Sequence, residues 1–197
     1  TYDTGGIGNV SGIIAANRNN VTVENCVMID SSGNDSSSIG INFTTTTNST
    51  IQNNTIYANG TSSTLGIFFT GSANNNTITN NTVQLQGTEG SSRGIYFNAG
   101  PSGNVISQNS IQSNGTASNF GISLSNSANN NNGTNNTIRM QGTSNLNIGI
   151  SIAISIGNNI SDNTIQTNGT NENIGIILSS SANNNAVTNN SIQTNGT

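Results

Sequence analysis

The chain has 197 residues, of which 5% are charged; three are Lys or Arg, seven are Asp or Glu, and the net charge is -4. Three scattered cations exclude a nucleic-acid partner, because binding to phosphates requires clustered Lys or Arg. No basic amphipathic stretch and no apolar run of about 18 residues is present, which argues against membrane insertion. Asn, Ser and Thr dominate the composition, but the regular spacing of Ile and Val predicts an ordered chain.

The first 36 residues match the rest of the chain only loosely. Met28 lies 28 residues before Ile56 and extends a series of apolar positions that continues to the C-terminus. We therefore expect one domain over residues 1–197, with a degenerate first turn at 1–36 and regular repeats at 37–197. Cys26 is the single cysteine and is expected to be a small core residue.

From residue 37 onward the chain repeats a unit of about 27 residues that closes with Gly-Thr, as at Gly60 and Thr61. One apolar position per unit recurs at intervals of 27 or 28 residues: Ile56, Val83, Ile111, Ile138, Ile165 and Ile192. A unit of this length is too short to enclose a core of its own. It must bury its apolar face against the neighbouring copies, as solenoid repeats do.

Each unit predicts three short strands. The unit opens with Gly-Ile and an alternation, seen at Ile67 and Phe69, that directs these side chains inward. Two further apolar positions five residues apart, such as Ile78 and Val83, mark the second and third strands. The residues of the opening strands that are expected to face outward are Asn42, Phe68, Tyr96, Ser123, Ser151 and Ile177. The sequence therefore predicts an all-β, single-stranded parallel β-solenoid of about seven turns.

Asparagine marks the bend between the second and third strands. The recurring residues are Asn54, Asn81, Asn109, Asn136, Asn163 and Asn190. Asn tolerates the left-handed conformation that a sharp bend requires. Identical Asn side chains stacked at one strand spacing also form hydrogen bonds along the axis, so we expect a structural ladder.

Two other bends are predicted from composition. The glycines of the closing Gly-Thr corner are expected to supply positive φ. The segments before the second strand, such as 72–75 and 127–130, vary between units and are expected to be tolerant loops.

The strand–bend–strand units NTITNNTV at 76–83 and NVTVENC at 20–26 resemble those of right-handed parallel β-helix proteins. That class includes pectate lyases, polygalacturonases, NosD-like periplasmic proteins and many surface proteins. The resemblance covers nearly the whole chain and implies the right-handed fold. It implies little about function, because one fold hosts many activities.

A catalytic or metal site is not predicted. The carboxylates are Asp3, Asp30, Asp35, Asp162, Glu24, Glu89 and Glu172. They do not share a column on adjacent turns, as a pair that cleaves glycosidic bonds would require. The chain also has no His for a nucleophilic triad. We therefore expect no enzyme activity, no catalytic or metal-binding residues and no cofactor.

Two kinds of surface site remain as candidates. Sequons recur at the closing corner, and the glycosylation candidates there are Asn59, Asn114, Asn168 and Asn195. Phe68 and Tyr96 share an outward column on consecutive turns, and together they are candidates for stacking on a sugar ring.

The ends of the solenoid suggest self-association. Segment 1–7 resembles the linker and Gly-Ile strand that would follow Thr197, because Gly6 then lies six residues after the closing Thr. This pattern predicts either head-to-tail stacking of copies or a segment of a longer repeat protein. We expect a structural subunit of an extracellular filament, stalk or adhesin at the cell surface, glycosylated and in contact with itself or with surface polysaccharide. The alternative is a carbohydrate-binding or carbohydrate-active β-helix whose catalytic turns lie outside this segment.

Overall fold

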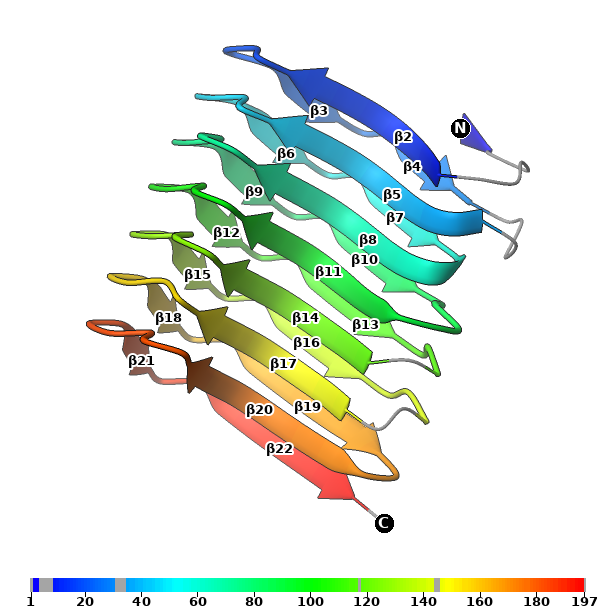
Figure 1. Cartoon of the computed structure of the whole chain (residues 1–197), viewed down its shortest axis with the longest axis vertical. Coiled ribbons are helices and arrows are strands. Elements are labelled where there is room, and N and C mark those ends of the chain that lie inside the picture. Colours follow the sequence, from blue (N-terminus) through cyan, green and yellow to red (C-terminus); the bar gives the residue numbers. More distant parts are fainter. Residues whose placement is uncertain (1, 4–8, 31–34, 117, 144–145, 197) are drawn as a thin grey trace.

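The computed structural model describes residues 2–3, 9–30, 35–116, 118–143 and 146–196. Within these residues the chain winds through three parallel β-sheets, and each turn contributes one strand to each sheet (Figure 1). The first sheet contains β2 (Asn9–Ala16), β5 (Asp35–Thr44), β8 (Gly60–Thr70), β11 (Ser91–Asn98), β14 (Ser118–Ser125), β17 (Leu146–Ala153) and β20 (Glu172–Ser179). The second sheet contains β3 (Thr22–Glu24), β6 (Thr50–Gln52), β9 (Thr77–Thr79), β12 (Val105–Ser107), β15 (Asn132–Thr134), β18 (Asn159–Ser161) and β21 (Ala186–Thr188). The third sheet contains β1 (Tyr2–Asp3), β4 (Val27–Ile29), β7 (Thr55–Ala58), β10 (Thr82–Leu85), β13 (Ser110–Ser113), β16 (Thr137–Met140), β19 (Thr164–Gly169) and β22 (Ser191–Gly196).

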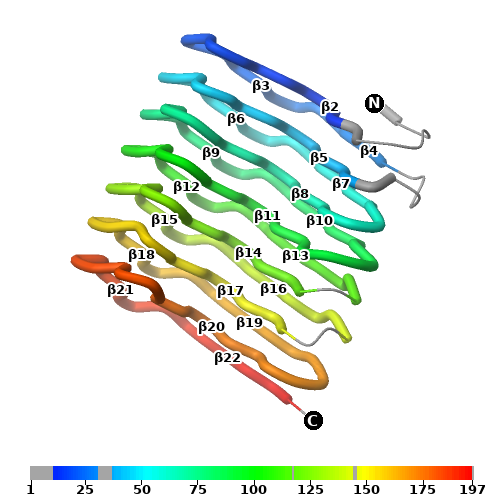
Figure 2. Tube along the Cα trace, in the orientation of Figure 1, coloured from blue at the N-terminus to red at the C-terminus, as the bar shows by residue number. Residues whose placement is uncertain are grey.

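The turns stack in register, so that equivalent residues form straight columns along the axis. Val83 pairs with Ile56 on one side and with Ile111 on the other, as the 27-residue spacing predicts. The Cα trace shows the turns one above the other, with β2–β4 at one end and β20–β22 at the opposite end (Figure 2). The predicted all-β parallel solenoid is therefore confirmed.

The core is a set of aliphatic and aromatic columns inside the coil. The inward pairs of the first sheet, among them Ile67 with Phe69, are fully buried. Phe69 lies between Phe43 and Phe97, with ring centroids 5.2 and 4.8 Å apart. Burial of each such side chain contributes roughly 1.5 to 3 kcal/mol. The stack of turns supplies the core that one 27-residue unit lacks.

One glycine in the interior of each first-sheet strand, just before the inward aliphatic residue, is required by close packing. These residues are Gly12, Gly40, Gly66, Gly94, Gly121, Gly149 and Gly175. A Cβ on Gly94 would overlap Ile111 Cγ2 across the interior and would lie 2.6 Å from the carbonyl oxygen of Gly121 on the next turn. The first and third sheets approach each other closely at this column, and only hydrogen fits between them.

The left-handed bend lies one residue before each ladder asparagine, so our assignment of that conformation to the ladder residue is wrong. Positive φ occurs at Asn25, Asn53, Asn80, Gln108, Asn135, Asp162 and Asn189. These side chains are exposed, whereas the asparagine that follows, such as Asn81, is 1% exposed. The two adjacent residues have separate roles for a physical reason. The left-handed residue turns the chain, and the side chain of the next residue can then point inward.

The closing-corner glycines also differ from prediction. Among the described glycines, positive φ is found at Gly71, Gly90, Gly100, Gly103 and Gly157, and none of these belongs to a Gly-Thr corner. In the central turns, at Gly87, Gly115, Gly142 and Gly169, the corner glycine is needed for space instead. A Cβ on Gly115 would collide with the carbonyl oxygen of Gly87 and would lie 2.9 Å from Asn119 Oδ1.

The segments expected to be tolerant loops contain buried residues, which is a second error in reading the bends. Ala73 and Ala128 are 0% exposed and belong to the core. Just after them runs a second, unpredicted asparagine ladder, formed by Asn76, Asn104, Asn131, Asn158 and Asn185. These segments therefore contribute to the interior, although the residue at the buried position varies between turns, as Thr46 and Ser155 show.

The N-terminal segment occupies a different column from the predicted one. Tyr2 pairs with Met28 and Asp3 with Ile29, so β1 belongs to the third sheet. The Gly-Ile pair of the first turn is Gly12 and Ile13, because Ile13 pairs with Ile41. Gly6 and Ile7, on which the predicted phase match relied, lie outside the described residues.

Gly133 is an irregularity in the core, and replacing it with alanine is expected to raise the free energy of unfolding by about 1 kcal/mol. It lies in β15 between Ile106 and Ile160, in a column of aliphatic residues. Its added Cβ would lie 3.0 Å from the movable Cδ1 of Ile160 and at an ordinary contact distance of 3.9 Å from the carbonyl oxygen of Asn159. A urea titration followed by circular dichroism measures the change; a lower midpoint for Gly133→Ala would show that the site has no room.

Candidate functional site

The described carboxylates are distributed over different columns. Glu24 Oε2 accepts a hydrogen bond of 2.7 Å from Gln52 Nε2 on the second sheet. Asp162 is an exposed bend residue, and Glu172 lies at the start of β20. Among the described residues, no group of three His, Cys, Asp or Glu lies close enough to hold a metal ion. Cys26 is half-buried against the core.

A stack of aromatic rings and one guanidinium lies on the outer face of the first sheet. Phe68 and Tyr96 stack with centroids 5.2 Å apart and planes 22° apart. The guanidinium carbon of Arg93 lies 4.6 Å from the centre of the Tyr96 ring and 5.0 Å from that of Phe120. Four side chains from three consecutive turns thus form one continuous stack. Each cation–π contact contributes roughly 0.5 to 2 kcal/mol.

The stack includes Phe68 and Tyr96, the two residues predicted to stack on a sugar ring. Phe68 and Tyr96 lie together in the outward column, but their ring faces are turned toward each other. Ser123 and Ser151 belong to the same column and were expected to face outward, yet they are only 3% and 9% exposed. Larger neighbouring side chains cover these short ones, so this outer face is less exposed to solvent than its sequence suggests.

Arg93 is held in an apolar setting. Burial lowers the pKa of Arg93, but a guanidinium remains charged throughout the physiological range. Its Nε is buried, and among the described residues it has no hydrogen-bond partner. Aromatic contacts therefore replace much of the hydration that this cation loses. The sequence contained a signal for the stack, because Arg93 and Phe120 are 27 residues apart and share a column.

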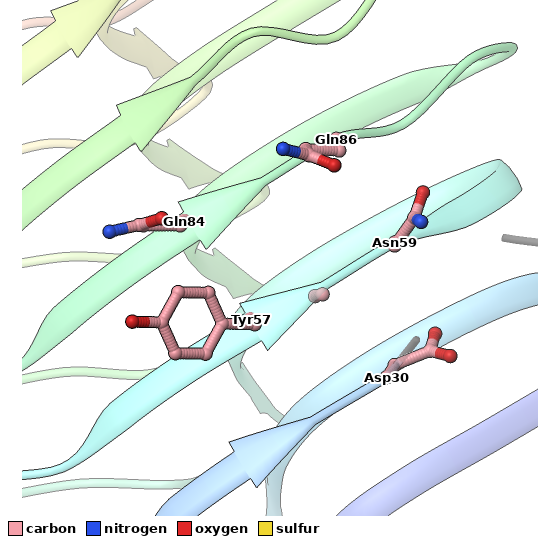
Figure 3. Close-up of a pocket in the computed structure, with 6 residues that line it drawn as sticks. Asp30, Tyr57, Asn59, Gln84 and Gln86 are labelled. Carbon is pink, nitrogen blue, oxygen red and sulfur yellow. The ribbon is translucent and has the colours of Figure 1, made fainter. Parts of the chain in front are cut away.

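A pocket of about 260 Å³ lies on the third sheet near the first turn. The described residues that line it are Asp30, Tyr57, Ala58, Asn59, Gln84 and Gln86. Tyr57 and Gln84 lie at one end, and Asn59, Gln86 and Asp30 at the other (Figure 3). Sequence analysis assigned no ligand-binding role to this group, although Tyr57 and Gln84 are one repeat apart and pair directly.

The closing-corner sequons are mostly exposed. Asn114, Asn168 and Asn195 are exposed, and Asn59 is half-buried beside the pocket. Exposure is required for attachment of a glycan, so three of the four positions meet this condition. Their occupancy stays a prediction.

The described part of the chain contains no helix of the length and apolarity needed to cross a membrane.

Comparisons with known proteins agree with the architecture. The family model described as "Right handed beta helix region" matches residues 7–111, which is more than half of the chain. Searches among curated proteins and among solved structures found no match. The matched segment includes the strands of the first three turns, from β2 to β10, and most of the fourth turn. The chain therefore belongs to the right-handed β-helix family.

Proposed function

We propose that this protein is a structural rod, a subunit of an extracellular filament, stalk or adhesin that grows by stacking one solenoid on another. The proposal is supported above all by the in-register columns of the stack, whose apolar side chains are fully buried only where a further turn covers them. Leu178, Val187 and Ile192 are 43%, 41% and 46% exposed. Their counterparts one turn earlier are Ile152, Ile160 and Ile165, which are at most 1% exposed.

The last turn also offers backbone groups for pairing. β20, β21 and β22 each form the edge of their sheet. A flat edge of unpaired N–H and C=O groups is a template for a further strand. Apolar side chains and open backbone on the same face favour a covering turn of the same kind.

The first turn of another copy is a suitable cover. Ala15, Val23 and Met28 stand in the same three columns as the exposed residues of the last turn. The small Ala15 would face the larger Leu178. In such a joint β22 of one copy would pair with β4 of the next copy. In the single chain that edge of β4 pairs with the two-residue β1, so β22 would replace β1 there. A contact of this kind is heterologous and propagates along the axis.

The outer surface supports a place outside the cell. Neutral amides and hydroxyls cover most of the third sheet, and exposed sequons recur along its corner. In this proposal the protein is glycosylated there, and its partners are further copies of itself.

Electron microscopy of the purified 197-residue chain over a range of concentrations tests the proposal. We expect fibres with an axial repeat of about seven strand spacings, roughly 34 Å. Ile192→Lys, which places a charge on the end face, is expected to abolish the fibres. Gln166→Lys, the matched change on the lateral face of the third sheet, is expected to leave them intact. Discrete short rods at every concentration, or fibres of Ile192→Lys, would contradict head-to-tail stacking and indicate that another segment covers this face.

A further inference from the structure

The pocket beside Tyr57 departs from the repeat that surrounds it. The outer column of the third sheet that contains Tyr57 continues with Gln84, Gln112, Arg139, Gln166 and Gln193. Tyr57 is the one aromatic residue in this column, and its side chain is 39% exposed. The solenoid does not require tyrosine here, because the other turns hold the same position without it. Local departures from an otherwise consistent pattern are typical of functional sites.

The lining residues come from three successive turns. Gln84 pairs with Tyr57, and Leu85 pairs with Ala58, so Gln86 and Asn59 follow side by side at the corner. Asp30 donates its backbone N–H to the carbonyl oxygen of Tyr57 at 2.9 Å, which fixes it next to β7. The parallel strands therefore hold the polar groups at spacings of about 4.8 Å. Tyr57, Ala58 and Gln84 lie on strands, and the other three lining residues each directly follow one. Such positions are held more firmly than those of a long loop.

The chemistry of the lining selects a class of ligand. Tyr57 supplies an apolar ring and a hydroxyl, and the amides of Asn59, Gln84 and Gln86 both donate and accept hydrogen bonds. Asp30 adds a carboxylate that accepts from hydroxyl groups. No Lys or Arg is among the described residues that line the pocket. Its one charged lining residue is thus an anion, which disfavours an anionic ligand.

We propose that this pocket binds one neutral sugar ring of a glycan. The apolar face of a pyranose would lie on the Tyr57 ring, and its hydroxyls would bond to the amides and to Asp30 at the other end. The volume of about 260 Å³ lies just below the range of roughly 300–1,000 Å³ usual for drug-sized ligands, so it suits a single ring. Because the site is small and partly open to solvent, we expect weak affinity, with a dissociation constant on the order of 1 mM.

Chemical-shift mapping on the ¹⁵N-labelled 197-residue chain tests this site. The Ile192→Lys variant is used as background, so that fibre formation does not broaden the signals and failure of the stacking proposal does not affect the result. The probes are methyl glycosides of glucose, galactose and mannose, with glucuronate as the anionic comparison. We expect saturable shifts confined to β4, β7 and β10 with at least one neutral glycoside, and a markedly weaker effect of glucuronate.

Matched variants separate the pocket from the general surface. Tyr57→Ala and Gln84→Ala are expected to weaken binding at least tenfold, whereas Gln166→Ala, in the same column three turns further on from Gln84, is expected to leave it unchanged. Circular dichroism checks that each variant is folded. The proposal is overturned if no neutral glycoside causes localised shifts, if Tyr57→Ala binds as the parent does, or if glucuronate binds equally well.

Discussion

Gly94→Ala is expected to lower the free energy of unfolding by about 3 kcal/mol or more, although it adds a single methyl group. The new Cβ would overlap Ile111 Cγ2 and would lie 2.6 Å from the carbonyl oxygen of Gly121. The Ile111 side chain has little room to move, because it is 1% exposed. The carbonyl belongs to the backbone of the next turn, so relief requires the two turns to separate. Chemical denaturation followed by circular dichroism measures the loss.

The matched control for this change is Gly133→Ala. Both glycines lie in central turns and are buried, but the one close neighbour of a Cβ on Gly133 is the end of the Ile160 side chain, and the nearest backbone atom is 3.9 Å away. The same substitution is therefore expected to destabilise at one site and to stabilise at the other. Equal effects would mean that backbone flexibility, and not space, determines the cost at Gly94.

The period of the sequence was sufficient to predict the fold. Residues such as Ile56, Val83 and Ile111 recur at one interval, and a 27-residue spacing allows no other place for them than a shared column. The alternation of Ile67, Phe68 and Phe69 separated inside from outside within a strand. Both signals depend only on repetition and on the two-residue period of a strand, which are local properties of the sequence.

The backbone at the bends was not predictable in the same way. Asn80 and Asn81 are adjacent and chemically identical, yet one is left-handed and exposed while the other forms the buried ladder. Composition cannot separate them, because only the direction in which the chain leaves the strand decides which side chain points inward. The requirement for glycine at position 94 was not predictable for a similar reason, since it depends on the distance between two sheets, which is a tertiary property.

The candidate sites were predicted in part. Phe68 and Tyr96 were placed in one column, but which way their rings face depends on side-chain packing that period alone does not describe. Arg93 was overlooked because our reading of the opening strand began after Gly94, where two consecutive residues point inward and shift the alternation. The pocket beside Tyr57 requires three turns to be superimposed residue by residue, and a search for exceptions within each column would have found it.

Asn109→Ala is expected to lower the free energy of unfolding by about 3–5 kcal/mol, because it interrupts the first asparagine ladder at its centre. Asn109 Oδ1 accepts hydrogen bonds from the backbone N–H and from Nδ2 of Asn81, both at 3.0 Å. Its Nδ2 donates to Ile78 O and to Asn136 Oδ1, also at 3.0 Å. Alanine removes all four bonds at a site that is 1% exposed, where water does not replace them. Thermal or urea unfolding measures the loss.

Asn190→Ala is the control for burial. Asn190 accepts the same pair of bonds from Asn163, but it is only half-buried in the last turn. Water can reach the donors of Asn163 that this substitution would leave unpaired. We therefore expect the free energy of unfolding to fall by only about 1 kcal/mol. Equal costs at residues 109 and 190 would show that the ladder adds little beyond the shape of the bend.

Asn109→Asp separates the hydrogen-bond pattern from the volume of the side chain. The carboxylate keeps the acceptor for Asn81, but it faces the oxygens of Ile78 and Asn136 without a proton to donate. Burial and these two acceptors raise the pKa of the new carboxyl above its unfolded value of about 3.9. The variant is therefore expected to be most stable below about pH 4 and to lose stability as the pH rises through the raised folded pKa. Asn109→Ala has no such group, so a pH-dependent difference between the two variants would isolate the contribution of the donated hydrogen bond.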